Sequence, residues 1–141
     1  MRVIIPDYKY ILVPFLMWFA IQFFKLIYDR IETKQWHLGR FWGAGGMPSS
    51  HSAVVVSLAT LIGKNVGIDS PLFALSAIFA FITMYDAAGV RRAVGKQAKI
   101  LNDILNNQKL TGVEKLQEMT GHTPIQVVTG ALIGFIGGLI F

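Results

Sequence analysis

A glycine-rich stretch containing one histidine stands between two apolar runs of this 141-residue chain. Residues 43–52 read GAGGMPSSHS, so His51 follows three glycines, a proline and two of the three serines. A glycine loop that leads into a helix start presents backbone N–H groups, and with a histidine these can bind an anion. The alternative interpretation is a polar membrane loop before a capped helix, in which Ser49 or Ser50 caps the first turn.

A second histidine opens the last apolar run in a similar context. Residues 121–126 read GHTPIQ, while Asp86 and the pair Arg91-Arg92 close another apolar run. Arginines bind phosphate through forked, charge-assisted hydrogen bonds. Two histidines can divide the work of phosphoryl transfer, because one can attack phosphorus while the other protonates the leaving oxygen.

The composition places this chemistry in a membrane. Hydrophobic residues make up 53% of the chain and charged residues 15%, and the mean hydropathy of +0.52 is too high for an ordinary soluble domain. The net charge of +5 fits basic membrane loops better than a nucleic-acid partner, because the aromatic residues lie within apolar runs. The absence of cysteine excludes disulfides, thiolate nucleophiles and cysteine-ligated metals.

We therefore expect an all-α fold, with residues 1–141 forming a single membrane domain. The apolar runs predict about four transmembrane helices, near residues 10–28, 49–66, 70–90 and 122–141. Polar loops fill residues 29–48 and 91–121. The second loop is expected to hold an amphipathic helix lying at the membrane surface, whose apolar face comprises Val94, Ala98, Leu101 and Leu105.

Two further features concern the helices themselves. Lys25 lies near the end of the first helix and is expected to extend to the membrane interface. Gly130, Gly134 and Gly138 recur every four residues and predict close helix packing. From this glycine face we also expect a homodimer.

Four crossings place the two polar loops on the same side of the membrane. These loops carry nine lysines and arginines against three on the other side, so the positive-inside rule predicts that they are cytoplasmic. The same topology brings His51, Asp86 and His122 to one membrane face. A site at that face suits a lipid phosphate whose tails stay in the bilayer.

Several segments together resemble a known superfamily. Residues 47–52 (MPSSHS) resemble the Pro-Ser-Gly-His motif of the type-2 phosphatidic acid phosphatase and vanadium haloperoxidase superfamily. Residues 122–127 (HTPIQV), with Gly130, resemble its final motif, His-x-x-x-Asp followed by a glycine-bearing helix. With residues 85–92 (YDAAGVRR), most of the chain from Lys34 onward is similar to a divergent branch of bacteria and plants related to acid phosphatases and vanadium haloperoxidases.

The resemblance implies roles for these residues. His122 would be the nucleophile that forms a phosphohistidine, and His51 the general acid for the leaving alcohol. The implied phosphate-binding residues are Lys34, Arg40, Ser49, Ser50, Arg91 and Arg92. The implied substrate is a lipid or prenyl phosphate monoester or diphosphate, and the implied location is the bacterial cell membrane. The phosphatase branch needs no metal or other cofactor.

The chain departs from this pattern in several places. Gln126 stands where the superfamily has an aspartate that orients the nucleophile, and an amide can orient a ring but cannot stabilise an imidazolium by charge. Ser50 replaces the motif glycine, and Lys34 and Arg40 are one residue closer than usual. About thirty residues separate Arg91 from His122, where the superfamily has a short spacing. The superfamily core has six helices, more than are expected here.

These departures leave three options open: Asp86 supplies the missing carboxylate, a dimer completes the site, or catalysis has been lost. We favour Asp86. A non-catalytic protein that binds or transports an anion with the same pocket is the alternative function. A metal site of His51, Asp86 and His122 is a third interpretation, against which the neighbouring arginines argue for an anion.

Overall fold

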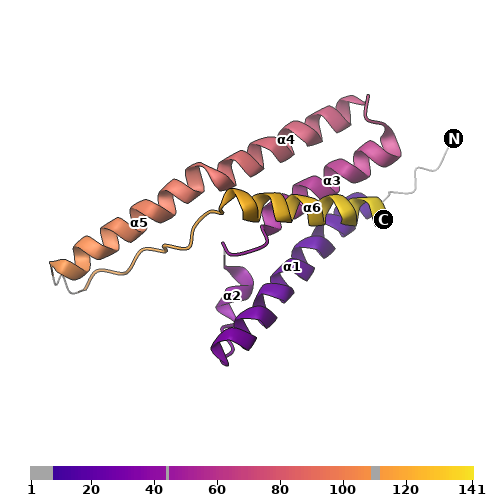
Figure 1. Ribbon diagram of the computed structural model, residues 1–141. Coiled ribbons are helices and arrows are strands. Elements are labelled where there is room, and N and C mark those ends of the chain that lie inside the picture. Colours follow the sequence, from indigo (N-terminus) through magenta and orange to yellow (C-terminus); the bar gives the residue numbers. More distant parts are fainter. Residues whose placement is uncertain (1–7, 44, 109–111) are drawn as a thin grey trace.

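The computed structural model describes residues 8–43, 45–108 and 112–141, and this described chain is helical with no strand. Its helices are α1 (Lys9–Thr33), α2 (Gly39–Trp42), α3 (Ser50–Val66), α4 (Pro71–Ala88), α5 (Val90–Asn107) and α6 (Pro124–Ile140) (Figure 1). The all-α prediction is confirmed, and the four long apolar runs correspond to α1, α3, α4 and α6. The side chain of Arg40 lies outside the described residues.

Side-chain caps explain where two of these helices begin. The Ser49 hydroxyl accepts a hydrogen bond from the backbone N–H of Ser52 at 3.3 Å and starts α3. The Ser70 hydroxyl accepts from the N–H of Phe73 at 3.1 Å, and Pro71 occupies the first helical position of α4. Each cap satisfies a backbone donor that has no partner within the helix.

Helices α3 and α6 pack closely and run in parallel. The three glycines of α6 that recur every four residues face α3, and a Cβ atom on any of them would collide with it. Gly130, Gly134 and Gly138 lie against Ser49, Ala53 and Ser57, respectively. The predicted use of these glycines in helix packing is confirmed. Because α3 covers this face within the same chain, a homodimer would need another surface.

Helices α1 and α4 run antiparallel to α3 on its other sides. Near the start of α1, the Lys9 ammonium donates to the Asn65 side chain of α3 at 2.8 Å. At the opposite end of the bundle, the N–H of His122 donates to the carbonyl of Ala87 in α4 at 2.9 Å. The start of α3, the end of α4 and the start of α6 therefore meet at one end, as the alternating topology predicts.

Helix α5 continues α4 beyond the bundle after a break at Gly89 (Figure 1). The chain then returns along α5 without regular structure. The Asn102 side chain holds this return segment through hydrogen bonds to the backbone oxygen and nitrogen of Leu116, at 2.8 and 2.9 Å. A Cβ on Gly95 would lie 2.6 Å from the carbonyl oxygens of Glu118 and Thr120, so glycine permits this close approach.

The chain itself covers only part of the predicted apolar face of this helix. Ala98 is buried, but Val94 and Leu101 are 47% and 48% exposed. The buried face instead comprises Gly95, Ala98 and Asn102. It contacts the polypeptide backbone of the return segment, and this contact requires small side chains and a hydrogen-bonding amide.

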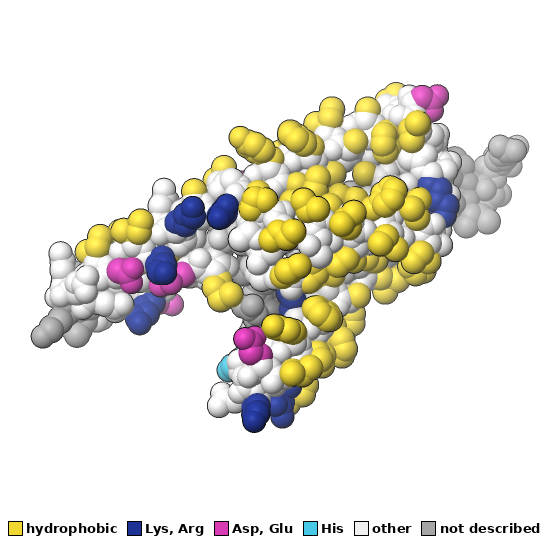
Figure 2. Space-filling model, in the orientation of Figure 1, with side chains coloured by type: hydrophobic (Ala, Val, Ile, Leu, Met, Phe, Trp, Pro, Cys, Tyr) yellow, Lys and Arg dark blue, Asp and Glu magenta, His cyan; other side chains and the backbone are white. Residues whose placement is uncertain are grey.

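Two helical stretches of the described residues are long and apolar enough to cross a membrane: Lys9–Thr33, and Pro71–Asn107, which comprises α4 and α5. Helix α6 is apolar but shorter. Figure 2 shows hydrophobic side chains spread over the face formed by α1, α4 and α6, while charged side chains gather over α5 and at the far end of α1. This distribution suits a bilayer around the bundle and water around its projecting ends.

The α3–α6 contact gives a stability prediction. Gly134→Ala should lower the free energy of unfolding by about 1–3 kcal/mol, because the new methyl group meets the rigid backbone of Ala53. Gly137→Ala is the matched control: its methyl group meets only the flexible end of Met17, so we expect a change within about 1 kcal/mol. Thermal unfolding in detergent, followed by circular dichroism, measures both variants. Equal melting temperatures would contradict the packing described here.

Candidate functional site

Two histidines lie side by side where α3 and α6 begin. Their ring centroids are 6.3 Å apart and the ring planes are inclined at 58°, so a single phosphoryl group can reach both rings. His51 belongs to the first turn of α3 and is half-buried, whereas His122 precedes α6 and is 3% exposed. Because the helices are parallel, the positive ends of two helix dipoles also meet here.

The glycine loop before α3 closes one side of this site. Gly45 and Gly46 have φ angles of 100° and 78°, in the left-handed region that favours glycine. A Cβ on Gly45 would lie 2.5 Å from the carbonyl oxygen of Met119. The loop therefore packs against the segment that leads to His122, and a larger residue at position 45 would collide with that segment.

Lys25 is a site residue that the sequence interpretation missed. The expectation that it extends to the membrane interface is wrong: Lys25 is 5% exposed, and its ammonium donates to the carbonyl oxygen of Gly45 at 3.0 Å. Its charge acts on both His51 and His122. The sequence did contain a signal for this role, because a lysine within a membrane-spanning helix by itself suggests a functional residue.

Gln22, one turn before Lys25, is buried as well. Its amide nitrogen donates to the carbonyl oxygen of Phe41 in α2 at 2.6 Å, while its amide oxygen has no hydrogen-bond partner among the described residues. Together, Gln22 and Lys25 tie α1 to α2 and to the glycine loop. These two hydrogen bonds hold the glycine loop in position beside the histidines.

The ring of His122 sits in surroundings that favour its neutral form. Burial lowers the pKa of His122 most, the positive charge of Lys25 lowers it further, and His51 acts in the same direction. The Gln126 side chain and the Gly46 backbone oppose this shift. A neutral imidazole is the form that can act as a nucleophile, so these surroundings suit the predicted role.

Gln126 shapes the loop that carries His122. Its side-chain oxygen accepts a hydrogen bond from the N–H of Thr123 at 2.9 Å, and this contact caps α6. The Nδ1 atom of His122 is buried and has no hydrogen-bond partner among the described residues. The amide therefore fixes the backbone around the histidine, but no acceptor holds this ring nitrogen.

Asp86 does not supply the missing carboxylate to His122. Its Oδ2 atom pairs with Nε of Arg91 at 2.6 Å, one helical turn further along the chain. Both residues act electrostatically on His51. Asp86 therefore holds Arg91 beside the site, and the expectation that it orients His122 is not met in the described structure.

The fold brings together the two ends of the long segment between Arg91 and His122. Gly121, with φ 84°, packs directly against the backbone of Arg91 and Arg92. Helix α5 and the return segment thus form a projecting hairpin whose two ends meet. Residues far apart in sequence become neighbours, as the short spacing of the superfamily motif would make them.

The other predicted phosphate-binding residues are placed differently. Ser49 and Ser50 are 0% and 3% exposed, and the Ser49 hydroxyl serves as the helix cap. Lys34 is exposed at the C-terminal end of α1, where its left-handed backbone (φ 59°) ends the helix. Within the described chain, Lys34 makes no hydrogen bond or ion pair with the predicted site residues.

His37 is exposed and pairs with Asp29 at 2.8 Å, at the far end of α1. No group of three or more histidine, aspartate or glutamate side chains in the described residues is arranged to hold a metal ion.

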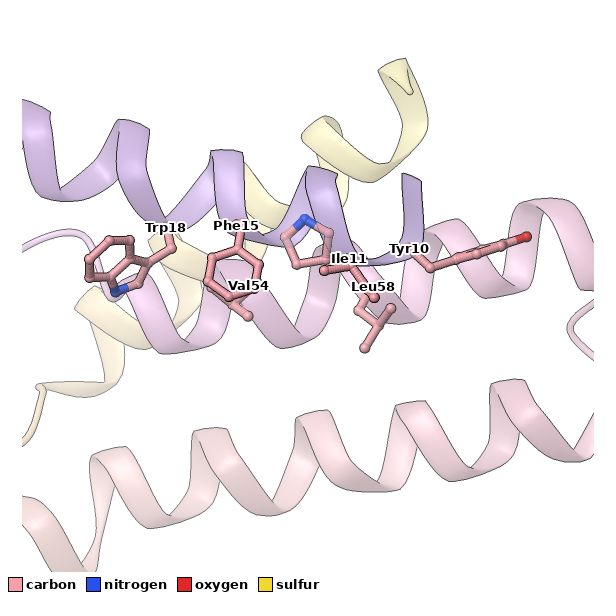
Figure 3. A pocket seen from close by; sticks show the side chains of 7 residues that line it. Tyr10, Ile11, Phe15, Trp18, Val54 and Leu58 are labelled. Atoms are coloured by element: carbon pink, nitrogen blue, oxygen red, sulfur yellow. The ribbon is translucent and has the colours of Figure 1, made fainter. Parts of the chain in front are cut away.

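Two hollows lie along α1, at different distances from this site. One is an apolar groove of about 380 Å³ between α1 and α3, where Phe15 and Trp18 lie near Val54 and Leu58 (Figure 3). The other is a groove of about 650 Å³ between α1, the glycine loop and α6, and Lys25 forms part of its wall. Only the second groove includes a residue of the two-histidine site.

The fold and the site define an all-helical membrane protein in which two paired histidines lie near a buried lysine, Lys25, and an arginine, Arg91. A sequence profile described as Divergent PAP2 family matches residues 7–137, and the chain belongs to that family. It is 46% identical over 110 residues to the "Uncharacterized membrane protein YuiD" of Bacillus subtilis (strain 168), a match covering 68% of this chain and 70% of the relative. No solved structure matches the chain significantly.

The charge of Lys25 gives a prediction for His122. In Lys25→Met, the pKa of His122 should rise relative to the wild type, because a positive charge that disfavours the imidazolium is gone. It should remain below the ordinary value of 6.5, because burial is the larger cause. Nuclear magnetic resonance titration of ¹⁵N-labelled histidine rings in detergent measures both proteins.

Lys64→Met is the matched control for this titration. Lys64 lies at the opposite end of α3, where its ammonium donates to the Leu139 carbonyl at 2.8 Å. Its removal should leave the His122 titration unchanged. Identical titrations in all three proteins would refute the proximity of Lys25 to this ring.

Proposed function

We propose that this protein is a membrane phosphatase that hydrolyses a lipid or prenyl phosphate monoester or diphosphate through a phosphohistidine. One observation carries the proposal: His51 and His122 are paired at two parallel helix N-termini, beside buried Lys25. Membership of the Divergent PAP2 family supports the same conclusion.

In this mechanism the neutral ring of His122 attacks phosphorus and the bond to the leaving oxygen breaks. His51 donates its proton to that oxygen, and the alcohol leaves. Water then attacks the phosphohistidine, His51 accepts a proton from it, and inorganic phosphate is released. Lys25 and Arg91 stabilise the negative charge on the phosphoryl oxygens throughout.

The site lies where the apolar bundle meets its charged ends. On the face that Figure 2 shows, hydrophobic side chains cover α1, α4 and α6, whereas many of the charged side chains lie over α5 and at the end of α1. A phosphate bound at this level would leave its hydrocarbon tail in the bilayer. The excess of lysine and arginine in residues 29–48 and 91–121 supports a cytoplasmic location for the site.

Phosphate release from a panel of lipid and prenyl phosphates in detergent tests the proposal. His122→Ala should abolish release, because the nucleophile is lost, and His51→Ala should slow it by about 10²–10⁴-fold, the usual contribution of a general acid. Acid-labile ³²P labelling should report the phosphohistidine in wild type and vanish in His122→Ala. His37→Ala, in the loop after α1, removes an exposed ring that pairs with Asp29, so it is the matched control and should keep wild-type activity. Equal release from His122→Ala and the wild type would overturn the mechanism.

A second candidate is a protein that binds or transports a lipid phosphate without hydrolysing it. The unpartnered Nδ1 of His122 and the capping role of Gln126 favour it, since no carboxylate stabilises a charged ring. It predicts saturable binding of a lipid phosphate by the wild type with no phosphate release from any substrate.

Cysteine labelling tests the proposed orientation, and the chain has no native cysteine to interfere. Asn106→Cys, on exposed α5, should resist an impermeant thiol reagent added outside intact cells. Asp69→Cys, in the exposed link between α3 and α4, should react rapidly. The reverse pattern would place the site on the outer face.

A further inference from the structure

The 650 Å³ groove between α1 and α6 changes character along its length. On α1 its wall begins with Met17, Ile21 and Phe24, and then turns polar at Lys25 and Asp29. Its other walls are the glycine loop at Met47 and Pro48, and Thr129 and Ile133 of α6. An apolar hollow with a few polar groups at one end is typical of a ligand site of this volume.

The helix arrangement closes the groove at one end and opens it at the other. A Cβ on Gly137 of α6 would meet the Met17 side chain, so the two helices touch there. From this point α1 diverges from α6 toward Thr33 (Figure 1). The residues of α1 that line the groove run in the same direction, from Met17 to Glu32, and include Lys25, whose charge acts on both histidines.

We propose that this groove holds the hydrocarbon chain of the lipid phosphate, with the phosphate at Lys25 and the chain running along α1 toward Met17. The proposal rests on the phosphatase function and specifies where the hydrocarbon chain of its substrate lies. Lys25 and Met17 are eight residues apart, or about 12 Å along the helix. The groove therefore holds the part of the chain nearest the phosphate.

Charge sets the direction in which the chain lies. The ammonium of Lys25 attracts the phosphate, while Asp29 and Glu32, which line the groove nearer the C-terminal end of α1, repel it. The apolar wall at Met17 and Phe24 excludes a charged group but accepts methylene groups. A phosphate with an apolar tail therefore satisfies both ends of the groove, whereas a free phosphate leaves the apolar end empty.

A photoreactive probe tests this proposal without requiring turnover. Hexadecyl phosphate with a diazirine on its sixth carbon is bound to the protein in detergent and photolysed, and the labelled residues are mapped by mass spectrometry. We expect labels within 17–24 and 129–133. Excess unlabelled hexadecyl phosphate should suppress the labelling, and hexadecanol should not, since it lacks the charged group.

Thr129→Trp should fill the groove and reduce the labelling at least fivefold. Thr83→Trp is the matched control, because Thr83 of α4 makes the same hydrogen bond to the carbonyl four residues earlier, at 2.8 Å, but does not line the groove. It should label like the wild type. Labelling that is unaffected by Thr129→Trp, or suppressed equally by hexadecanol, would overturn the proposal.

The failure of this proposal can be separated from the failure of the phosphatase function. Groove labelling without phosphate release from any substrate would refute catalysis and support the chain site. Phosphate release with labels confined to the outer faces of α3 and α4 would support catalysis and refute the chain site.

Discussion

The structure depends on the close parallel contact between α3 and α6. Gly130 and Gly134 lie on the backbone of Ser49 and Ala53, so the two helices approach without intervening side chains. The backbone N–H of Ser49 also donates to the carbonyl oxygen of Gln126 at 3.1 Å, which joins the start of α3 to the first turn of α6. His51 lies in the first turn of α3 and His122 just before α6, so this packing brings the two rings together.

The same packing concentrates positive potential at one end of the bundle. Two helix N-termini converge there, and Lys25 adds a buried charge next to the rings. Burial lowers the pKa of His122 most, and the positive charge of Lys25 lowers it further, because additional positive charge is unfavourable in this position. An anion is the ligand that relieves this imbalance, whether or not the site turns it over.

Local signals in the sequence are sufficient for the helices and their meeting point, but not for the partners of individual polar groups. Ser49, one of the two serines expected to do so, caps α3, and the alternating crossings correctly bring both histidines to one end. Lys25 could not be placed, because its partner is a loop carbonyl twenty residues away whose position depends on two left-handed glycines. Asp86 pairs with Arg91 because the chain breaks at Gly89, a detail of backbone geometry that hydrophobic periodicity does not report.

The replacement of aspartate by Gln126 has a specific consequence in these surroundings. A carboxylate beside a nucleophilic histidine stabilises the charge that the ring acquires during attack. Here burial and the charge of Lys25 already favour a neutral ring, and Gln126 opposes them only as an uncharged amide, so the ring begins in the reactive form without the stabilisation that a carboxylate would give. The negative charge of the bound phosphate must then offset the developing imidazolium. Catalysis in this site would thus depend on how closely Lys25 and Arg91 hold the phosphoryl oxygens against the ring.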